Sequence, residues 1–192
     1  MKLSKTELPG VLIVETSAFG DDRGWFMESF NEPRWLAGLQ ALGEPVPRRF
    51  VQDNHSCSQA GVLRGLHYQM PPHAQGKLVR VAKGSAFDVA VDIRKGSPHF
   101  GRWLGMELSA ANRRQLWIPE GFAHAFVALE DDTHFLYKTT DVYAKDCERS
   151  IRWDDADIGI VWPTIGGQPF VPRLAPKDAA APGLKQADLP PL

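Results

Sequence analysis

The stretch KLVRVAKGSAFDVAVDIR at residues 77–94 decides the fold class. In its second half, apolar side chains occupy every second position, at Phe87, Val89, Val91 and Ile93. Successive side chains of a β-strand point to opposite faces, so this alternation gives one strand a continuous apolar face. The stretch predicts two strands, 77–83 and 85–94, separated by a glycine turn.

The other face of the second strand carries Ala86, Asp88, Ala90 and Asp92. A solvated outer face with two carboxylates is the simplest interpretation of this alternation. Small alanines between carboxylates are also what the interior of a ligand-filled barrel requires. Both interpretations remain open at this stage.

Short alternating runs of this kind, bounded by Gly, Pro, Asn and Asp, extend over most of the chain. Many short strands at close spacing predict an all-β sandwich or barrel. Candidate strands lie at 11–15, 26–31, 50–55, 62–68, 77–83, 85–94, 102–108, 115–118, 123–129, 134–140 and 150–153.

One helix is predicted after the second candidate strand. Asn31 can cap it, Pro33 suits its first turn, and apolar residues recur at helical spacing from Trp35 to Leu42 before Gly43. We expect this helix to pack on the outside of the sheet.

The composition changes near residue 163, because seven of the 15 prolines fall in the last 30 residues. We interpret residues 1–192 as a single domain whose Pro-rich C-terminal segment, from about residue 163, is either an ordered wrap or a partly loose tail. We expect Lys177, Asp178 and the alanines after them to begin a short helical turn in this segment.

Overall charge and cysteine content exclude several classes of protein. The chain has 22 Lys and Arg against 23 Asp and Glu, so it lacks the positive field that binds nucleic acid, and an anionic ligand needs a local basic cluster. Cys57 and Cys147 stand alone, which argues against a disulfide framework and a structural zinc site. With no apolar run of membrane-spanning length, we expect a soluble cytoplasmic protein without a membrane partner.

In VLRGLHYQ at 62–69, Arg64 and His67 are three residues apart, so a regular strand would point them to opposite faces. Glycine within a strand often marks a bulge, and one extra residue at Gly65 brings both side chains to the same side. A guanidinium beside an imidazole can hold an anionic substrate next to a base.

In PEGFAHAF at 119–126, Phe122, His124 and Phe126 share one face. The spacing resembles the second histidine motif of metal-dependent cupins, but Ala128 replaces their usual Asn and HYQ at 67–69 lacks the second His of their HxH element. Two histidines are fewer ligands than a tightly held transition metal needs, so a metal site is disfavoured. In FLYKTTDVY at 135–143, Tyr137 shares a face with Phe135, which by itself indicates packing.

Taken together, these segments resemble one family, the dTDP-4-dehydrorhamnose 3,5-epimerases. The matching motifs follow in family order: DDRGWFMESF (21–30), FVQDNHS (50–56), GVLRGLHYQ (61–69), QGKLVRV (75–81), FDVAVDIRKGSP (87–98), RQLWIPEGFAHAF (114–126), LYKTTDVY (136–143), IRWDD (151–155), IGIVWP (158–163) and PKDAAAP (176–182).

The resemblance implies a cupin-type jelly-roll β-barrel with a few short peripheral helices, a homodimer that exchanges strands near its N-terminus, a dTDP-sugar substrate, and no metal or organic cofactor. It also implies roles for single residues. The base is His67, oriented by Asp178, and the acid is Tyr137. The implied substrate-contacting residues are Arg64, Lys77 and His124 in the sugar pocket, and Arg23, Glu28, Gln52, Asn54, Tyr143, Glu148 and Lys177 around the rest of the nucleotide sugar, with Arg23 and Glu28 supplied by the partner subunit.

Two positions depart from the family pattern. Val142 replaces a common second aromatic, so stacking on the thymine depends more on Tyr143, and Trp25 replaces a common Phe beside Arg23.

The residue types suit an epimerisation next to a ketone, because histidine changes protonation state near neutral pH and a tyrosine hydroxyl is protonated there. Two alternatives remain. One is a monofunctional C3- or C5-epimerase of a related dTDP-4-keto-6-deoxy sugar, and the other is a non-catalytic or metal-dependent cupin.

Overall fold

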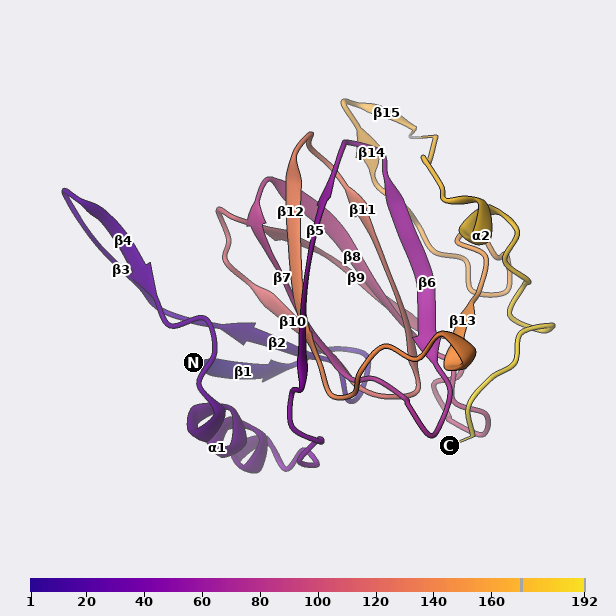
Figure 1. The fold of residues 1–192 in the computed structure, drawn as a ribbon, viewed down its shortest axis with the longest axis horizontal. Helices are drawn as coiled ribbons and strands as arrows, with labels where there is room; N and C mark the ends of the chain where they lie inside the picture. The colour runs from indigo at the N-terminus through magenta and orange to yellow at the C-terminus, as the bar shows by residue number, and fades with distance from the viewer. Residues whose placement is uncertain (170, 192) are drawn as a thin grey trace.

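The computed structural model describes residues 1–169 and 171–191, and two antiparallel sheets face each other in it (Figure 1). One sheet has the strand order β1-β2-β10-β7-β12-β5 and the other has the order β13-β6-β11-β8-β9. The bounds are β1 Lys2–Lys5, β2 Leu12–Glu15, β5 Gln52–Ser58, β6 Leu63–Gln69, β7 Lys77–Lys83, β8 Ser85–Asp92, β9 Trp103–Ser109, β10 Gln115–Ile118, β11 Phe122–Ala128, β12 Thr133–Thr139 and β13 Glu148–Ser150. This jelly-roll arrangement confirms the predicted all-β class.

Most predicted strands are observed with ends shifted by one to three residues, and 77–83 and 115–118 keep the predicted ends. The prediction at 150–153 is largely wrong, because β13 ends at Ser150. The prediction at 26–31 is also wrong beyond Met27, where β4 (Gly24–Met27) ends. β1 was not predicted, since only one of its four side chains is buried and its apolar pattern is weak.

Apolar side chains from both sheets fill the space between them. Phe126 of β11 and Phe135 of β12 stack across this space with ring centroids 3.9 Å apart. Ala86 and Ala90 of β8 belong to the same core cluster. The even-numbered residues of β8, which include Ala86 and Ala90, therefore face the interior of the sandwich.

The outer face of β8 is covered as well. Val89 and Val91 pack beneath Leu184 and Leu189 of the C-terminal segment. The interpretation of a solvated face with Asp88 and Asp92 is wrong, since both residues are 0% exposed and share the interior face with Ala86 and Ala90. The alternation of one strand does not show which of its faces points into the sandwich, or that a distant segment covers the other face.

Strand β6 contains the bulge predicted at Gly65. Its partner β11 pairs His124 with His67 and Phe126 with Arg64, so three steps on β6 match two steps on β11. A Cβ on Gly65 would lie 2.5 Å from the carbonyl oxygen of His124 and 2.6 Å from Cβ of Ala125. Only glycine allows β11 to approach this closely, and the extra residue turns Arg64 and His67 to the same side of the sheet.

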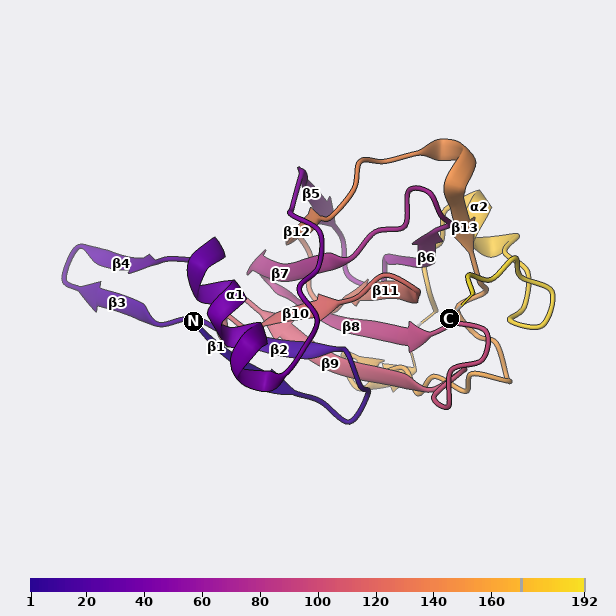
Figure 2. The same cartoon turned by 90° about the horizontal axis from the view of Figure 1, so that it is seen from below.

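Two peripheral elements precede β5. The hairpin of β3 (Ala18–Asp21) and β4 projects away from the sandwich (Figures 1 and 2) and exposes Phe19, Trp25 and Phe26. Helix α1 (Glu32–Leu42) begins and ends as predicted, with Asn31 accepting from the backbone N–H of Arg34 and Gly43 in the left-handed conformation.

Trp35 of α1 packs edge-on against Trp117 of β10, which confirms that the helix lies outside the six-stranded sheet. No helix within the described residues is long and apolar enough to cross a membrane.

The C-terminal segment runs along the five-stranded sheet (Figure 1). It forms the short strands β14 (Thr164–Ile165) and β15 (Gln168–Pro169), and then the helical turn α2 (Pro176–Ala179) at the position expected for Lys177 and Asp178. The hydroxyl of Tyr68 on β6 donates to the carbonyl oxygen of Asp188 at 2.6 Å. This bond and the buried leucines fix α2 beside β6.

We predict that Gly65→Ala destabilises the fold by about 3 kcal/mol, because the new methyl group overlaps backbone atoms of β11. Gly167→Ala is the matched control, since Gly167 also has a positive φ, +76°, but has open space around it. The control should lose only about 1 kcal/mol, the strain of a left-handed alanine. Thermal unfolding measures both variants, and equal losses would contradict the close approach at Gly65.

Candidate active site

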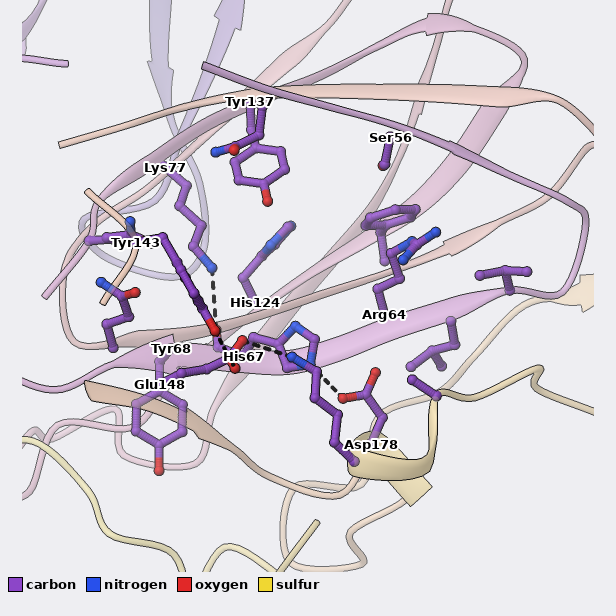
Figure 3. A pocket seen from close by; sticks show the side chains of 18 of the residues that line it. Ser56, Arg64, His67, Tyr68, Lys77, His124, Tyr137, Tyr143, Glu148 and Asp178 are labelled. Atoms are coloured by element: carbon purple, nitrogen blue, oxygen red, sulfur yellow. Dashed lines mark hydrogen bonds and ion pairs between the residues drawn. The ribbon is translucent and has the colours of Figure 1, made fainter. Parts of the chain in front are cut away.

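A cavity of about 330 Å³ lies between the two sheets, and residues of β5 and β6 are part of its lining (Figure 3). Its volume suits a small polar ligand. All but two of the predicted site residues line it: Gln52, Asn54, Arg64, His67, Lys77, His124, Tyr137, Tyr143, Glu148, Lys177 and Asp178.

His67 and Asp178 form the closest polar pair in the cavity wall, with His67 Nε2 and Asp178 Oδ1 2.5 Å apart. Asp178 is 2% exposed and comes from α2, 111 residues further along the chain. A neutral imidazole that donates from Nε2 keeps an unprotonated Nδ1. The pair therefore presents a nitrogen base whose orientation is fixed by a buried carboxylate.

Tyr137 enters the cavity from the opposite sheet, and its hydroxyl points toward His67 (Figure 3). Burial raises the pKa of this phenol above its ordinary value, while the charge of Arg64 acts in the opposite direction. The hydroxyl therefore remains protonated well above neutral pH and can act as a proton donor.

Lys77 of β7 supplies a positive charge deep in the cavity. Its Nζ lies 3.5 Å from the carbonyl oxygen of His67, and the residue is 9% exposed. Burial lowers the pKa of Lys77 to about 8, and the charges of Asp88 and Glu148 only partly oppose this shift. The amine is thus protonated at neutral pH and loses its proton at mildly alkaline pH.

His124 of β11 forms a second histidine–carboxylate pair, with Nε2 2.7 Å from Oδ1 of Asp88. Burial lowers the pKa of His124 against the opposing charge of Asp88. Neutral His124 donates from Nε2 and retains Nδ1 as an acceptor. Asp88 therefore orients His124, whereas Asp92 pairs with Arg94 at 2.6 Å and does not line the cavity.

At the other end of the cavity, Glu148 accepts hydrogen bonds from Lys177 Nζ at 2.8 Å and from the hydroxyl of Tyr143 at 3.2 Å. Burial opposes ionisation of Glu148, but Lys177 together with His67 and Tyr143 holds its pKa below the ordinary value. Gln52 accepts from the backbone N–H of Tyr143 at 3.0 Å and donates to Asn54. These contacts orient the half-exposed ring of Tyr143 at the cavity mouth.

Gln69, which the sequence analysis missed, supports the same loop. Its Oε1 accepts from the backbone N–H of Ala144 at 2.8 Å, and its Nε2 donates to the carbonyl oxygens of His73 at 2.6 Å and Val142 at 3.2 Å. The sequence signal for it was its position two residues after His67, on the same face of β6.

Arg23 and Glu28 do not line the cavity of their own chain within the described residues. Arg23, at the turn of the β3–β4 hairpin, bonds to Asp21, and Glu28 bonds to Asn31 and Arg34. If they act at a cavity, as predicted, it belongs to another chain.

The sequence and the fold both match one set of known proteins. A family model described as dTDP-4-dehydrorhamnose 3,5-epimerase matches residues 5–186. The chain belongs to this epimerase family. It is therefore an isomerase.

The family members with this name include close relatives. The Shigella flexneri epimerase is 57% identical over 180 residues, which are 89% of this chain and 97% of the relative. The Salmonella typhimurium epimerase is 55% identical over 189 residues, 97% of each chain.

Solved structures show the same similarity. A dTDP-6-deoxy-D-glucose-3,5-epimerase from Legionella pneumophila, solved in complex with dTDP-4-keto-L-rhamnose, is 48% identical with a TM-score of 0.90, covering 100% of this chain and 98% of that one. A 3'-monoepimerase from Streptomyces bikiniensis, solved with dTDP-quinovose, is 34% identical with a TM-score of 0.85. The match covers 97% of this chain and 91% of the monoepimerase chain.

The two histidines in the cupin-like motifs, His67 and His124, are each hydrogen-bonded to a carboxylate in this epimerase. Nε2 of His67 bonds to Asp178, and Nε2 of His124 bonds to Asp88. Among residues 1–169 and 171–191, no three His, Cys, Asp or Glu side chains form a group that could hold a metal ion. Metal independence remains a prediction.

We predict that epimerase activity survives prolonged treatment with EDTA followed by dialysis, because the cavity supplies base, acid and cation from side chains alone. The measurement is the initial rate before and after chelation, with elemental analysis of both samples. A stoichiometric metal whose removal abolishes activity, and whose return restores it, would require a different mechanism.

Proposed function

We propose that this chain converts dTDP-4-dehydro-6-deoxy-D-glucose to dTDP-4-dehydro-L-rhamnose by inverting C3 and C5 of the sugar. The observation that supports this most directly is the placement of His67, bonded to Asp178, opposite Tyr137 across the cavity. A base and an acid on opposite walls can remove a proton from one ring face and return one to the other.

The first step is proton abstraction. The C4 ketone acidifies the hydrogens on C3 and C5, and Nδ1 of His67 removes one of them. The electron pair of the broken C–H bond moves toward C4 and its oxygen, which gives an enolate. Asp178 stabilises the imidazolium that forms, since it already accepts the hydrogen bond from Nε2.

Lys77 stabilises the negative charge on the enolate oxygen. Its ammonium group is buried, so its electrostatic effect is stronger than in water and it needs little reorganisation during the reaction. His124, through its free Nδ1, is an acceptor for a sugar hydroxyl beside this centre.

Tyr137 completes the inversion. Its hydroxyl proton goes to the carbanion carbon from the face opposite His67, and a tyrosinate remains. Burial, which raises the pKa of Tyr137, makes that tyrosinate a strong base that readily recovers a proton. The proton held by His67 returns to solvent, so both groups are reset before the second carbon reacts.

The nucleotide lies toward the cavity mouth. Tyr143 stacks on the thymine, while Gln52, Asn54, Glu148 and Lys177 supply polar contacts along this wall. These assignments follow the family resemblance, and the hydrogen bonds among these residues support them.

A homodimer completes the site in this proposal. The β3–β4 hairpin exposes Phe19, Trp25 and Phe26, and β5 is an unpaired edge of the six-stranded sheet. An exchanged hairpin that pairs near β5 covers these aromatic residues and carries Arg23 and Glu28 to the partner's cavity. Sedimentation equilibrium of the native chain and of Trp25→Ala measures this association.

Cys57 and Cys147 are both free thiols, which fits a reducing compartment such as the cytoplasm.

The runner-up function is epimerisation of a single carbon. Identity to relatives named 3,5-epimerases, up to 57%, exceeds the 34% to the monoepimerase described above, which favours the bifunctional assignment.

We predict that the wild-type enzyme in deuterated water incorporates deuterium at both C3 and C5 of dTDP-4-dehydro-6-deoxy-D-glucose. His67→Asn should abolish exchange at both carbons, because His67 is the proposed base for both, and NMR follows each position separately. Tyr137→Phe should retain exchange and lose inversion. Exchange at one carbon in the wild type would support the monofunctional alternative, and normal product from Tyr137→Phe would transfer the acid role to another group.

We predict that kcat/KM falls as pH rises through about 8, the pKa to which burial lowers Lys77. The sign follows from the charge required: the ammonium form predominates below this pKa and is lost about tenfold per pH unit above it. Lys77→Arg keeps its charge throughout, so its profile should lack this limb even if its rate is lower. An unchanged limb near pH 8 in the arginine variant would assign the titration to another group.

A further inference from the structure

Arg173 lies on the part of the C-terminal segment that is hydrogen-bonded directly to the start of β6. Its backbone N–H donates to the carbonyl oxygen of Gly61 at 2.8 Å, and its carbonyl oxygen accepts from the N–H of Leu63 at 3.2 Å. These two bonds make a parallel bridge between Arg173 and Val62. The backbone of this arginine is therefore fixed, although it lies outside the named strands.

This bridge determines which way the side chain points. Bridged residues in a β-ladder project to the same face, and so do residues two apart along a strand. Arg173, Val62 and Arg64 therefore share a face, and all three line the active-site cavity. Two arginines from segments far apart in the sequence therefore contribute to the same cavity wall.

The cavity is lined by four basic residues, Arg64, Lys77, Arg173 and Lys177, which differ in their partners. Lys177 is paired with Glu148 at 2.8 Å, and Lys77 is buried beside the backbone of His67. Arg64 donates from Nε to Ser58 at 3.2 Å. For the guanidinium of Arg173, the described part of the chain offers no hydrogen bond or carboxylate within ion-pair distance.

Two neighbouring guanidinium groups without a carboxylate repel each other, and a bound anion relieves that repulsion. Ser56 of β5 adds a hydroxyl whose Oγ is buried without a hydrogen-bond partner in the described residues. Figure 3 shows Ser56 and Arg64 on the same side of the cavity, away from Lys77 and Tyr143. At this end of the cavity, the hydroxyl of Ser56 and the terminal nitrogens of Arg64 have no hydrogen-bond acceptor in the described residues.

We propose that Arg173 acts with Arg64 to bind the diphosphate of the nucleotide sugar. This inference rests on the proposed function and adds a binding residue to it. The diphosphate is the part of such a ligand with permanent negative charge, and the planar fork of arginine matches pairs of phosphate oxygens. Arg173 is a substrate-binding residue and takes no part in proton transfer.

The test compares two ligands that differ only in the diphosphate. Binding of dTDP and of thymidine is measured by calorimetry for the wild type and Arg173→Ala. We expect the variant to bind dTDP about tenfold or more weakly, as for the loss of a charged hydrogen-bonded contact, and to bind thymidine unchanged. The affinity of Arg173→Lys for dTDP should lie between those of the wild type and Arg173→Ala, since lysine keeps the positive charge but lacks the planar guanidinium. The KM for the nucleotide sugar should rise in the same order.

Arg102→Ala is the matched control, because Arg102 is another exposed arginine and it does not line this cavity. It should leave both affinities unchanged. Unchanged dTDP affinity in Arg173→Ala, or equal weakening of dTDP and thymidine, would overturn the assignment. A wild-type protein that binds neither ligand would overturn the proposed function itself, so the two failures are distinguishable.

Discussion

The hydrogen bond between His67 and Asp178 joins residues 111 positions apart, and the active site depends on it. Nothing local to β6 supplies that carboxylate. It arrives because the C-terminal segment buries Leu184 and Leu189 on the outer face of the five-stranded sheet. Burying two leucines contributes several kcal/mol, more than a single polar contact, so apolar packing positions the segment and the hydrogen bond makes use of that position.

The same low-polarity interior that stabilises the sandwich also tunes the chemistry. Burial lowers the pKa of Lys77 to about 8 and raises that of Tyr137, so that the amine is labile near physiological pH and the phenol is not. Asp88 partly opposes the effect of burial on the pKa of Lys77. Its Oδ1 accepts from His124, while its Oδ2 has no hydrogen-bond partner in the described residues and adds a negative potential that favours the charged form of Lys77.

Much of this architecture could be predicted from the sequence, because period-two alternation reports local geometry. Alternation predicted most strands, Asn31 and Gly43 predicted both ends of α1, and Gly65 predicted the bulge. The covering of β8 could not be predicted, since it depends on a segment about 100 residues away.

Two cavity residues depend in the same way on segments that are distant in the sequence. Arg173 acquires its position only from a bridge to Val62, and Gln69 acquires its role only from a loop that folds over it. Apart from Arg23 and Glu28, the residues that the family resemblance named line one cavity, and the resemblance paired His67 with Asp178. It did not indicate the hydrogen bond between Lys177 and Glu148.

The spacing of the two sheets explains why one base and one acid can serve two carbons. Facing sheets pack about 10 Å apart, which leaves room for one pyranose ring between side chains from each wall. His67 belongs to the five-stranded sheet and Tyr137 to the six-stranded sheet. In a D-gluco ring, the axial hydrogens on C3 and C5 lie on the same face, so a single base beneath that face reaches both. Inversion then requires only that the acid stay on the opposite wall, and the sandwich imposes that separation through its core.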